Sequence, residues 1–185
     1  MKSMEELRRE MSCARKALSP ETVEELSRRI VKRVERLQEY KQARNVMIYR
    51  AVHGEVRLEL LRGKNFIYPL CTGPGEMCAL LPEGEGAWRK GAFGIPEPVR
   101  EVSREIAPEE IDLVLCPCAA FDADCRRLGM GGGYYDRFLP KCTGAKFIAA
   151  AYEFQKAEEI LTRSWDIPMD AVVTEERIYR RKEKR

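Results

Sequence analysis

The sequence of 185 residues predicts a single α/β domain with three layers, α/β/α, around a mostly parallel or mixed central sheet. Three observations lead to this prediction. Apolar residues recur at helical spacing near the N-terminus, short apolar runs of strand length follow, and neither a repeat nor a linker divides the chain. We therefore expect one domain over residues 1–185, with N-terminal helices in 1–41 and a basic tail at 180–185.

Two helices are expected at the N-terminus. Apolar side chains lie three or four residues apart from Leu7 to Leu18, and again from Val23 to Leu37. Between these stretches, Ser19 has the residue type of an N-cap and Pro20 suits the first helical position. The two helices are therefore expected to meet at Ser19.

Six later stretches have the length of strands: 45–49, 65–70, 77–81, 112–117, 146–152 and 170–175. Runs such as "LVLC" at 113–116 and "FIAAA" at 147–151 do not alternate polar with apolar residues. Continuous apolar runs are typical of strands that are covered on both faces. They favour a parallel or mixed sheet with helices on its two sides.

Composition and charge exclude several classes of protein. Apolar residues are 44% of the chain and charged residues 34%, and no apolar run approaches the roughly 20 residues of a membrane helix. The N-terminus, "MKSMEELRREM", is too charged for a signal peptide, so we expect a cytoplasmic protein without a membrane partner. The last six residues hold five basic groups and one acid, a net +4, so the rest of the chain carries −1 of the formal charge of +3; we therefore expect no nucleic-acid partner.

The seven cysteines show no disulfide-framework spacing. The closest pair, Cys116 and Cys118, is one residue apart, and the only histidine, His53, is distant in sequence. We expect reduced thiols in a cytosolic protein, and a zinc site is disfavoured.

The stretch "RRLGMGGGYYDRFL" at 126–139 has the chemistry of a phosphate-binding loop. Glycines accept positive φ and let main-chain N–H groups approach an anion, while neighbouring arginines neutralise phosphate oxygens. Asp136 can hold magnesium, which commonly takes one or two carboxylates together with nucleotide phosphates. A plain turn followed by an ordinary helix start is the alternative. Walker A, complete G-x-G-x-x-G, G-x-S-x-G and zincin motifs do not occur.

The position of this loop favours the phosphate-binding interpretation. It follows the expected strand 112–117, and open α/β sheets bind ligands at the carboxyl ends of their strands. Glu55 follows the expected strand 45–49 and is a candidate for the same edge, although a solvated loop glutamate is the simpler interpretation from sequence alone.

The stretch "DLVLCPCAAFDADCRRLGMGGGYYDRFL" resembles the signature of the 5-formyltetrahydrofolate cyclo-ligase family, also called methenyltetrahydrofolate synthetases. Weaker similarities extend over nearly the whole chain: "LRREM", "GEV" at 54–56, "GIPEP" at 94–98 and "AYEFQ…DIPMDAVVTE" at 151–175. The resemblance implies ATP- and magnesium-dependent closure of 5-formyltetrahydrofolate to 5,10-methenyltetrahydrofolate, with release of ADP and phosphate. In the family's proposed chemistry the formyl oxygen attacks the γ-phosphate, and nitrogen-10 then displaces phosphate from the activated carbon.

The resemblance also implies roles for individual residues. Arg127, Tyr134 and Asp136 are expected to be catalytic, and Asp136 and Asp166 to hold the metal. Glu55 would grip the pterin, since one carboxylate can accept from a ring N–H and the adjacent amino group together, and Tyr152 and Gln155 would line the folate side. The folate would also border Met130, Gly131, Gly132, Gly133 and Tyr134. The expected ATP site comprises Arg8, Arg127, Leu128, Gly129, Met130, Gly131, Gly132, Gly133, Tyr134 and Tyr135.

Three positions depart from the family pattern: Met4 where a lysine is usual, Leu58 where a threonine is usual and Trp165 where a histidine is frequent. Two alternatives stay open at this point. One is a non-catalytic relative that binds folate or nucleotide, and Met4 favours it. The other is an ATP-dependent kinase or ligase on the same scaffold with a different substrate. A monomer is expected in either case.

Overall fold

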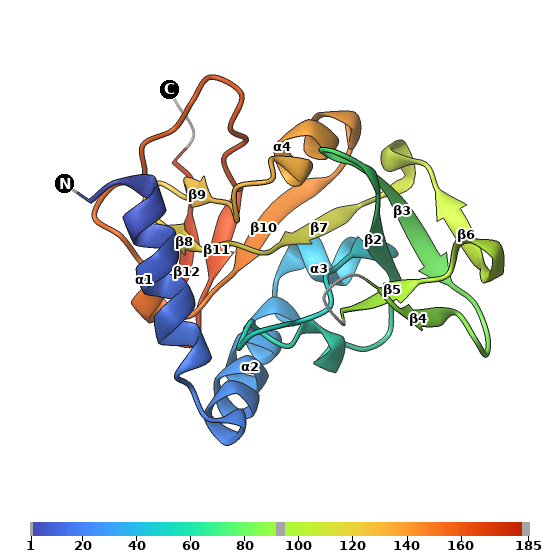
Figure 1. The fold of residues 1–185 in the computed structure, drawn as a ribbon, viewed down its shortest axis with the longest axis horizontal. Helices are drawn as coiled ribbons and strands as arrows, with labels where there is room; N and C mark the ends of the chain where they lie inside the picture. The colour runs from blue at the N-terminus through green and yellow to red at the C-terminus, as the bar shows by residue number, and fades with distance from the viewer. Residues whose placement is uncertain (1, 92–94, 183–185) are drawn as a thin grey trace.

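The computed structural model describes residues 2–91 and 95–182. Its main sheet has eight strands in the order β12-β11-β10-β7-β1-β2-β3-β6 (Figure 1). The five strands from β11 to β2 in this order run parallel, while β12, β3 and β6 are paired antiparallel with their neighbours. The predicted α/β class with a largely parallel, mixed sheet is thus confirmed. The strands are β1 (Asn45–Met47), β2 (Asn65–Gly73), β3 (Glu76–Pro82), β6 (Ser103–Ile106), β7 (Leu113–Cys116), β10 (Lys146–Ala150), β11 (Ala171–Val173) and β12 (Ile178–Arg180).

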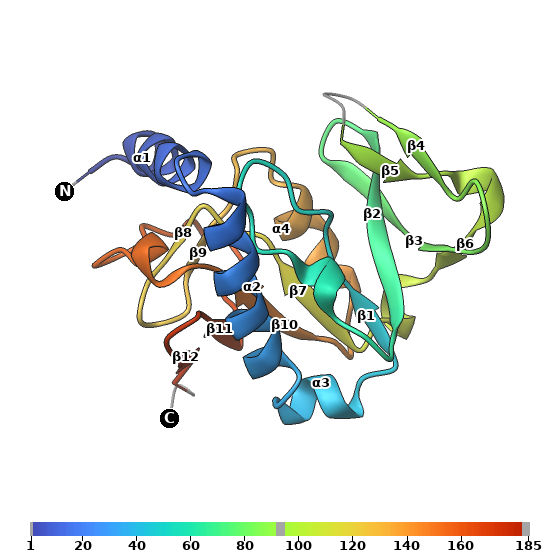
Figure 2. The same cartoon turned by 90° about the horizontal axis from the view of Figure 1, so that it is seen from below.

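Both faces of this sheet are buried, as the continuous apolar runs predict. Alternate residues of each central strand enter two separate cores; in β7, for example, Leu113 and Leu115 join one and Val114 and Cys116 the other. Helices α2 (Pro20–Val34) and α3 (Gln38–Gln42) cover the first face (Figure 2). The second face is covered by the short α4 (Tyr134–Phe138) and by 3₁₀ turns, so this helical layer is thin.

The N-terminal helices begin where their capping residues place them. In α1 (Met4–Lys16), Ser3 and Glu6 form a reciprocal capping box. In α2, the Ser19 side chain accepts from the Thr22 N–H and Pro20 occupies the first turn, which confirms the predicted start of that helix. Helix α1 packs through Met11 on residues of a small two-stranded hairpin and not on the main sheet.

That hairpin, β8 (Ala120–Phe121) with β9 (Arg127–Leu128), follows β7 directly and leads into the glycine loop and α4. Figure 1 shows β9 between α1 and the main sheet. A second small hairpin, β4 (Trp88–Lys90) with β5 (Pro96–Pro98), packs beside β2. The carboxyl ends of β1, β7 and β10 therefore open toward one edge, at which the hairpin and the glycine loop lie.

All six predicted strands exist, with ends that differ by up to three residues. The expected basic tail begins later than predicted, because Arg180 is the last residue of β12 and is paired with Glu39 of α3. Residues 183–185 of that tail, and Gly94 of the "GIPEP" similarity, lie outside the described residues. Within the part of the chain that is described, no helix is long and apolar enough to cross a membrane.

Candidate active site

The glycine loop joins β9 to α4 and depends on its glycines at three positions. Gly131 has φ of 107° and Gly133, the N-cap of α4, has φ of 66°, a left-handed conformation that side chains disfavour. At Gly132 the limit is space, since a Cβ there would lie 2.7 Å from the Tyr134 ring. The loop therefore keeps an open backbone that an anion can approach.

Arg127 lies beneath the loop and is only 6% exposed. Its Nη2 donates to Asp136 Oδ1 at 2.6 Å, and the same carboxylate oxygen accepts from the Ile167 N–H at 3.3 Å. The Arg127 Nε is buried without a protein partner. The predicted catalytic arginine and metal-binding aspartate thus form a mostly buried ion pair.

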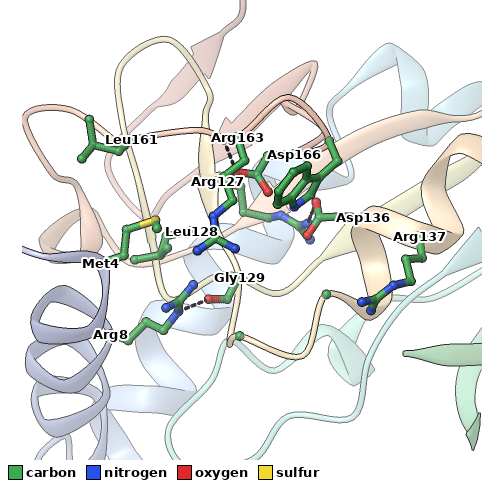
Figure 3. Close-up of a pocket in the computed structure, with 13 residues that line it drawn as sticks. Met4, Arg8, Arg127, Leu128, Gly129, Asp136, Arg137, Leu161, Arg163 and Asp166 are labelled. Carbon is green, nitrogen blue, oxygen red and sulfur yellow. Dashed lines mark hydrogen bonds and ion pairs between the residues drawn. The ribbon is translucent and has the colours of Figure 1, made fainter. Parts of the chain in front are cut away.

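A cavity of about 320 Å³, here called the arginine cavity, lies on one side of the loop (Figure 3). Arg8 reaches it from α1 and donates from Nε to the Gly129 carbonyl oxygen at 2.8 Å. Asp166 lies on the facing segment, where its Oδ2 accepts from the Arg163 N–H at 2.7 Å. The lining residues are Met4, Arg8, Arg127, Leu128, Gly129, Gly131, Gly133, Asp136, Arg137, Leu161, Arg163, Trp165 and Asp166.

The chemistry of the arginine cavity suits a polyphosphate with a divalent cation. Four arginines and two carboxylates line it, so the wall carries a net positive charge. The glycines of the loop add backbone that no side chain covers. Asp136 and Asp166, the two expected metal ligands, both line this cavity. Among the described residues no three His, Cys, Asp or Glu side chains are grouped as a metal site. A cation here would need oxygens from its ligand as well, as magnesium does with nucleotides.

A second cavity of about 170 Å³, here called the apolar cavity, lies on the other side of the loop. Strands β2 and β3 contribute Pro69, Cys71 and Met77 to it, and Tyr134 and Met130 lie on the loop side. Its wall is almost entirely apolar, which suits a flat heterocycle. The complete lining is Pro69, Cys71, Met77, Pro117, Arg127, Gly129, Met130, Gly132, Gly133, Tyr134, Tyr135 and Asp136.

The two cavities share part of their walls. Arg127, Gly129, Gly133 and Asp136 line both of them. A group held in one cavity therefore meets a group held in the other at the Arg127–Asp136 pair.

Glu55 is not among the lining residues of either cavity. It is 9% exposed, its Oε1 lies 3.4 Å from Arg15 Nη1, and its Oε2 accepts from the Val52 N–H at 3.1 Å. Burial raises the pKa of Glu55, against the lowering effect of Arg15. Burial also raises the pKa of Tyr135.

Tyr134 and Tyr135 line the apolar cavity only, whereas the ATP site was expected to include them. Met130 and Gly132 likewise line only the apolar cavity, and Leu128 only the arginine cavity. Tyr152 and Gln155, expected on the folate side, are buried and line neither cavity.

The three departures from the family pattern differ in their positions. Met4 and Trp165 both line the arginine cavity, and Leu58 is fully buried in the core. Sequence reasoning did not identify Leu161, Arg163 or the β2–β3 residues of the apolar cavity. These residues lie far from the glycine motif in sequence, and only the proximity of Arg163 to Asp166 could have indicated one of them.

Fold and loop together define a class of protein: an α/β protein with a glycine-rich, arginine-lined loop at the carboxyl edge of a parallel sheet, where such proteins bind phosphate groups. Comparison with known proteins gives the family. The model of the 5-formyltetrahydrofolate cyclo-ligase family matches residues 1–175, and the chain belongs to this family.

Individual relatives agree with this assignment. A 5-formyltetrahydrofolate cyclo-ligase of Haemophilus influenzae is 33% identical over 71% of this chain and 75% of its own length. The Escherichia coli protein of the same name is 28% identical over 89% of this chain and 96% of its own. The solved structure of Aquifex aeolicus 5,10-methenyltetrahydrofolate synthetase superposes with a TM-score of 0.84 and 35% identity, covering 98% of this chain and 94% of that one.

Proposed function

We propose that the chain closes 5-formyltetrahydrofolate to 5,10-methenyltetrahydrofolate at the glycine loop, with magnesium-ATP in the arginine cavity and the folate in the apolar cavity. Membership of the family makes the chain a 5-formyltetrahydrofolate cyclo-ligase, an ATP-dependent ligase of folate one-carbon metabolism. One observation carries the assignment of the two cavities. They differ in chemistry, one cationic and one apolar, and they meet at Arg127 and Asp136.

The nucleotide phosphates suit the arginine cavity. Arg8 of α1 and Arg127 of β9 supply guanidinium groups. The left-handed backbone at Gly131 and Gly133 leaves main-chain N–H groups accessible. Arg127 already has the partner Asp136 for one nitrogen, while its buried Nε has no hydrogen-bond partner among the described residues. Because Arg127 is packed and paired in advance, little side-chain entropy is lost when a phosphate binds.

Asp136 and Asp166 would hold magnesium together with phosphate oxygens. Two carboxylates on one cavity are the usual protein contribution to a magnesium-nucleotide site. When bound, the cation would neutralise charge on the transferred phosphoryl group. Asp136 also keeps Arg127 in place at the junction of the two cavities.

The reaction needs no nucleophile from the protein. The formyl oxygen of the substrate attacks the γ-phosphorus, ADP leaves, and the phosphorylated imidate forms. Nitrogen-10 then adds to the activated carbon, and phosphate departs with the former formyl oxygen and the proton from nitrogen-10 as the methenyl bridge closes. Positioning and charge stabilisation are the main contributions that a protein makes to phosphoryl transfer. Arg127, in the wall shared by the two cavities, would stabilise the negative charge that the phosphoryl group carries in both steps.

The pterin suits the apolar cavity, with Tyr134 offering a ring face beside Met130. Glu55 is proposed to accept from the pterin ring N–H and its amino group, with Arg15 as its counter-ion. The support for this role is the match of Glu55 to the family's pterin-binding acid, together with a buried carboxylate that accepts one hydrogen bond from the backbone, that of Val52. We further propose a cytoplasmic monomer without a nucleic-acid partner.

A near-ultraviolet absorbance time course tests the function. Purified protein is mixed with folinic acid and magnesium, ATP is added or withheld, and the methenyl chromophore is followed. ATP-dependent growth that the Asp136→Asn variant fails to produce is the expected result. A flat trace from folded protein that still binds folinic acid would support the non-catalytic relative, and ATP binding without folate binding would support a different substrate.

A further inference from the structure

The β8–β9 hairpin contains a buried carboxylate that lines neither of the two cavities. Asp122 is 2% exposed, at the turn that precedes β9. Its Oδ1 accepts from the N–H groups of Asp124 and Arg126, both at 3.0 Å. Its Oδ2 accepts from the Ile160 N–H at 3.0 Å and faces Arg126 Nη1 at 3.3 Å. Four donors thus surround one carboxylate, which accounts for its burial.

These bonds reach the two facing walls of the arginine cavity. Arg126 directly precedes Arg127, the first residue of the wall formed by the loop. Ile160 directly precedes Leu161, the first residue of the 161–166 wall. A single side chain therefore joins the residues that precede the two walls.

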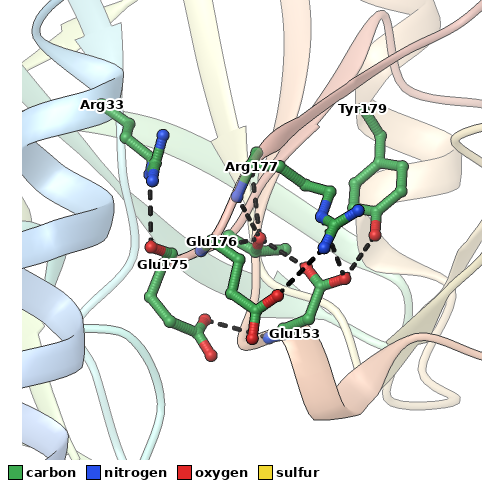
Figure 4. A network of polar contacts seen from close by, with 7 residues as sticks. Arg33, Glu153, Glu175, Glu176, Arg177 and Tyr179 are labelled. Carbon is green, nitrogen blue, oxygen red and sulfur yellow. Dashed lines mark hydrogen bonds and ion pairs between the residues drawn. The ribbon is translucent and has the colours of Figure 1, made fainter.

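The segment that leads to Ile160 is itself fixed to the rest of the protein. The Ala157 N–H donates to the Phe121 carbonyl at 2.7 Å, and Gln155 Nε2 donates to the Cys118 and Ala119 carbonyls at 2.9 and 2.8 Å. Further back, Glu153 accepts from Tyr179 and Thr174 of the C-terminal hairpin (Figure 4). The 153–160 segment is thus joined to the C-terminal hairpin and, through the Ala157–Phe121 bond, to the β8–β9 hairpin, and the Asp122–Ile160 bond adds a side-chain connection at its end.

We propose that Asp122 is a positioning residue for the nucleotide: it sets the width of the arginine cavity by holding Arg126 and Ile160 on one carboxylate. This inference rests on the proposed function, in which ATP occupies that cavity. Asparagine at this position has the same shape, and its amide oxygen can still accept from Asp124 and Arg126. Its NH₂ group cannot accept from the Ile160 N–H, so the substitution removes the bond from this side chain to Ile160 and keeps its two backbone bonds within the hairpin.

The test is ATP and folinic acid binding to Asp122→Asn by calorimetry, with steady-state kinetics beside it. We expect ATP to bind roughly 10- to 100-fold more weakly, the range seen when a supporting hydrogen bond is lost or a ligand is misplaced. The KM for ATP should rise accordingly, while folinic acid affinity stays within about twofold, since the β2–β3 wall of the apolar cavity has no bond to Asp122 among the described contacts.

Asn45→Ala is the matched control. Asn45 Nδ2 donates to the Glu110 carbonyl at 2.8 Å, at the opposite edge of the sheet. The Asn45→Ala substitution should lower the melting temperature and leave the affinities for ATP and folinic acid unchanged. The proposal is overturned if Asp122→Asn binds ATP as the wild type does, or if it loses ATP and folinic acid affinity equally, the result of a merely structural role. Wild-type protein that binds no ATP would overturn the proposed function as well.

Hydrogen exchange of the wild-type protein keeps the proposal testable if Asp122→Asn does not fold. With both amides on one carboxylate, the Arg126 and Ile160 N–H groups should exchange at similar rates, and ATP should slow both. Rates that differ by orders of magnitude, or ATP protection of Arg126 alone, would contradict the proposal.

Discussion

At the residue scale, the Arg127–Asp136 pair combines a structural with a proposed catalytic role. The Arg127 side chain is 2% exposed and that of Asp136 18%, so neutralising the aspartate leaves an almost fully buried guanidinium without its partner. Breaking a buried pair in this way commonly costs about 3–5 kcal/mol. Loss of activity in a variant at either position must therefore be separated from loss of stability.

Asp136→Asn should lower both turnover and stability, and a second substitution distinguishes the two effects. We expect kcat to fall roughly 100-fold, as when one charge-stabilising group is removed from an active site. Urea unfolding should show a lower free energy of unfolding. Adding Arg127→Met to Asp136→Asn should restore part of that stability and none of the turnover. A double variant that regained turnover would show that the pair has only a structural role.

Glu55 yields a prediction about pH. Burial raises its pKa above the ordinary 4.5, and the proposed bonds to the pterin require the ionised form. Folinic acid should therefore bind more weakly as the pH falls through this raised pKa, before an ordinary carboxylate would titrate. Glu55→Gln should bind folinic acid more weakly at neutral pH and lose that pH-dependent step, with ATP affinity unchanged. Calorimetry across the acid range measures both; an unaltered pH profile in Glu55→Gln would remove the pterin role.

At the element scale, the sequence predicts those strands that are buried on both faces. Strands such as β7 show a continuous apolar run because each of their residues faces a core. The missed strands lack that signal: all three residues of β4 are exposed, and β6 has the polar sequence "SREI". β4 pairs with β5 in a separate two-stranded sheet, and β6 pairs with β3 at the end of the main sheet. Both pairings depend on backbone hydrogen bonds, which local composition does not report.

The same limit applies to the candidate site. The glycine motif locates the loop, because the chemistry of its residues is local. The wall around Leu161 and the β2–β3 wall at Met77 belong to other elements that tertiary packing brings to the loop. Only the family resemblance connected Asp166 with Asp136.

Helix α1 contributes Met4 and Arg8 to the arginine cavity, one turn apart. A cation at Met4 would face the same cavity as Arg8, so Met4→Lys should tighten ATP binding and steepen its salt dependence. A gain of roughly 3- to 10-fold is expected from one added charge-assisted contact of about 1 kcal/mol. Cys13→Lys adds the same charge at an exposed position of α1 and should change ATP affinity little. Equal gains in both variants would mean that the effect is one of net charge.

At the scale of the whole molecule, the two cavities lie on opposite sides of one loop and share only a narrow wall. The arginine cavity is built from α1, the loop and the 161–166 segment, and the apolar cavity from the loop and the β2–β3 pair. In the proposed assignment, each ligand would contact elements that the other does not touch. The assignment predicts that a probe placed in one cavity reports on one ligand.

Cys71 is such a probe, because it is exposed on β2 and lines the apolar cavity. Burial raises its pKa, so a maleimide should label it faster as the pH is raised. Folinic acid at ten times its Kd should slow this labelling roughly tenfold by occupancy alone, whereas ATP should leave the rate nearly unchanged. Mass spectrometry of the Cys71 peptide, in a Cys13→Ser background that removes the other exposed thiol, measures the rate. Protection by ATP and not by folinic acid would reverse the assignment of the two cavities.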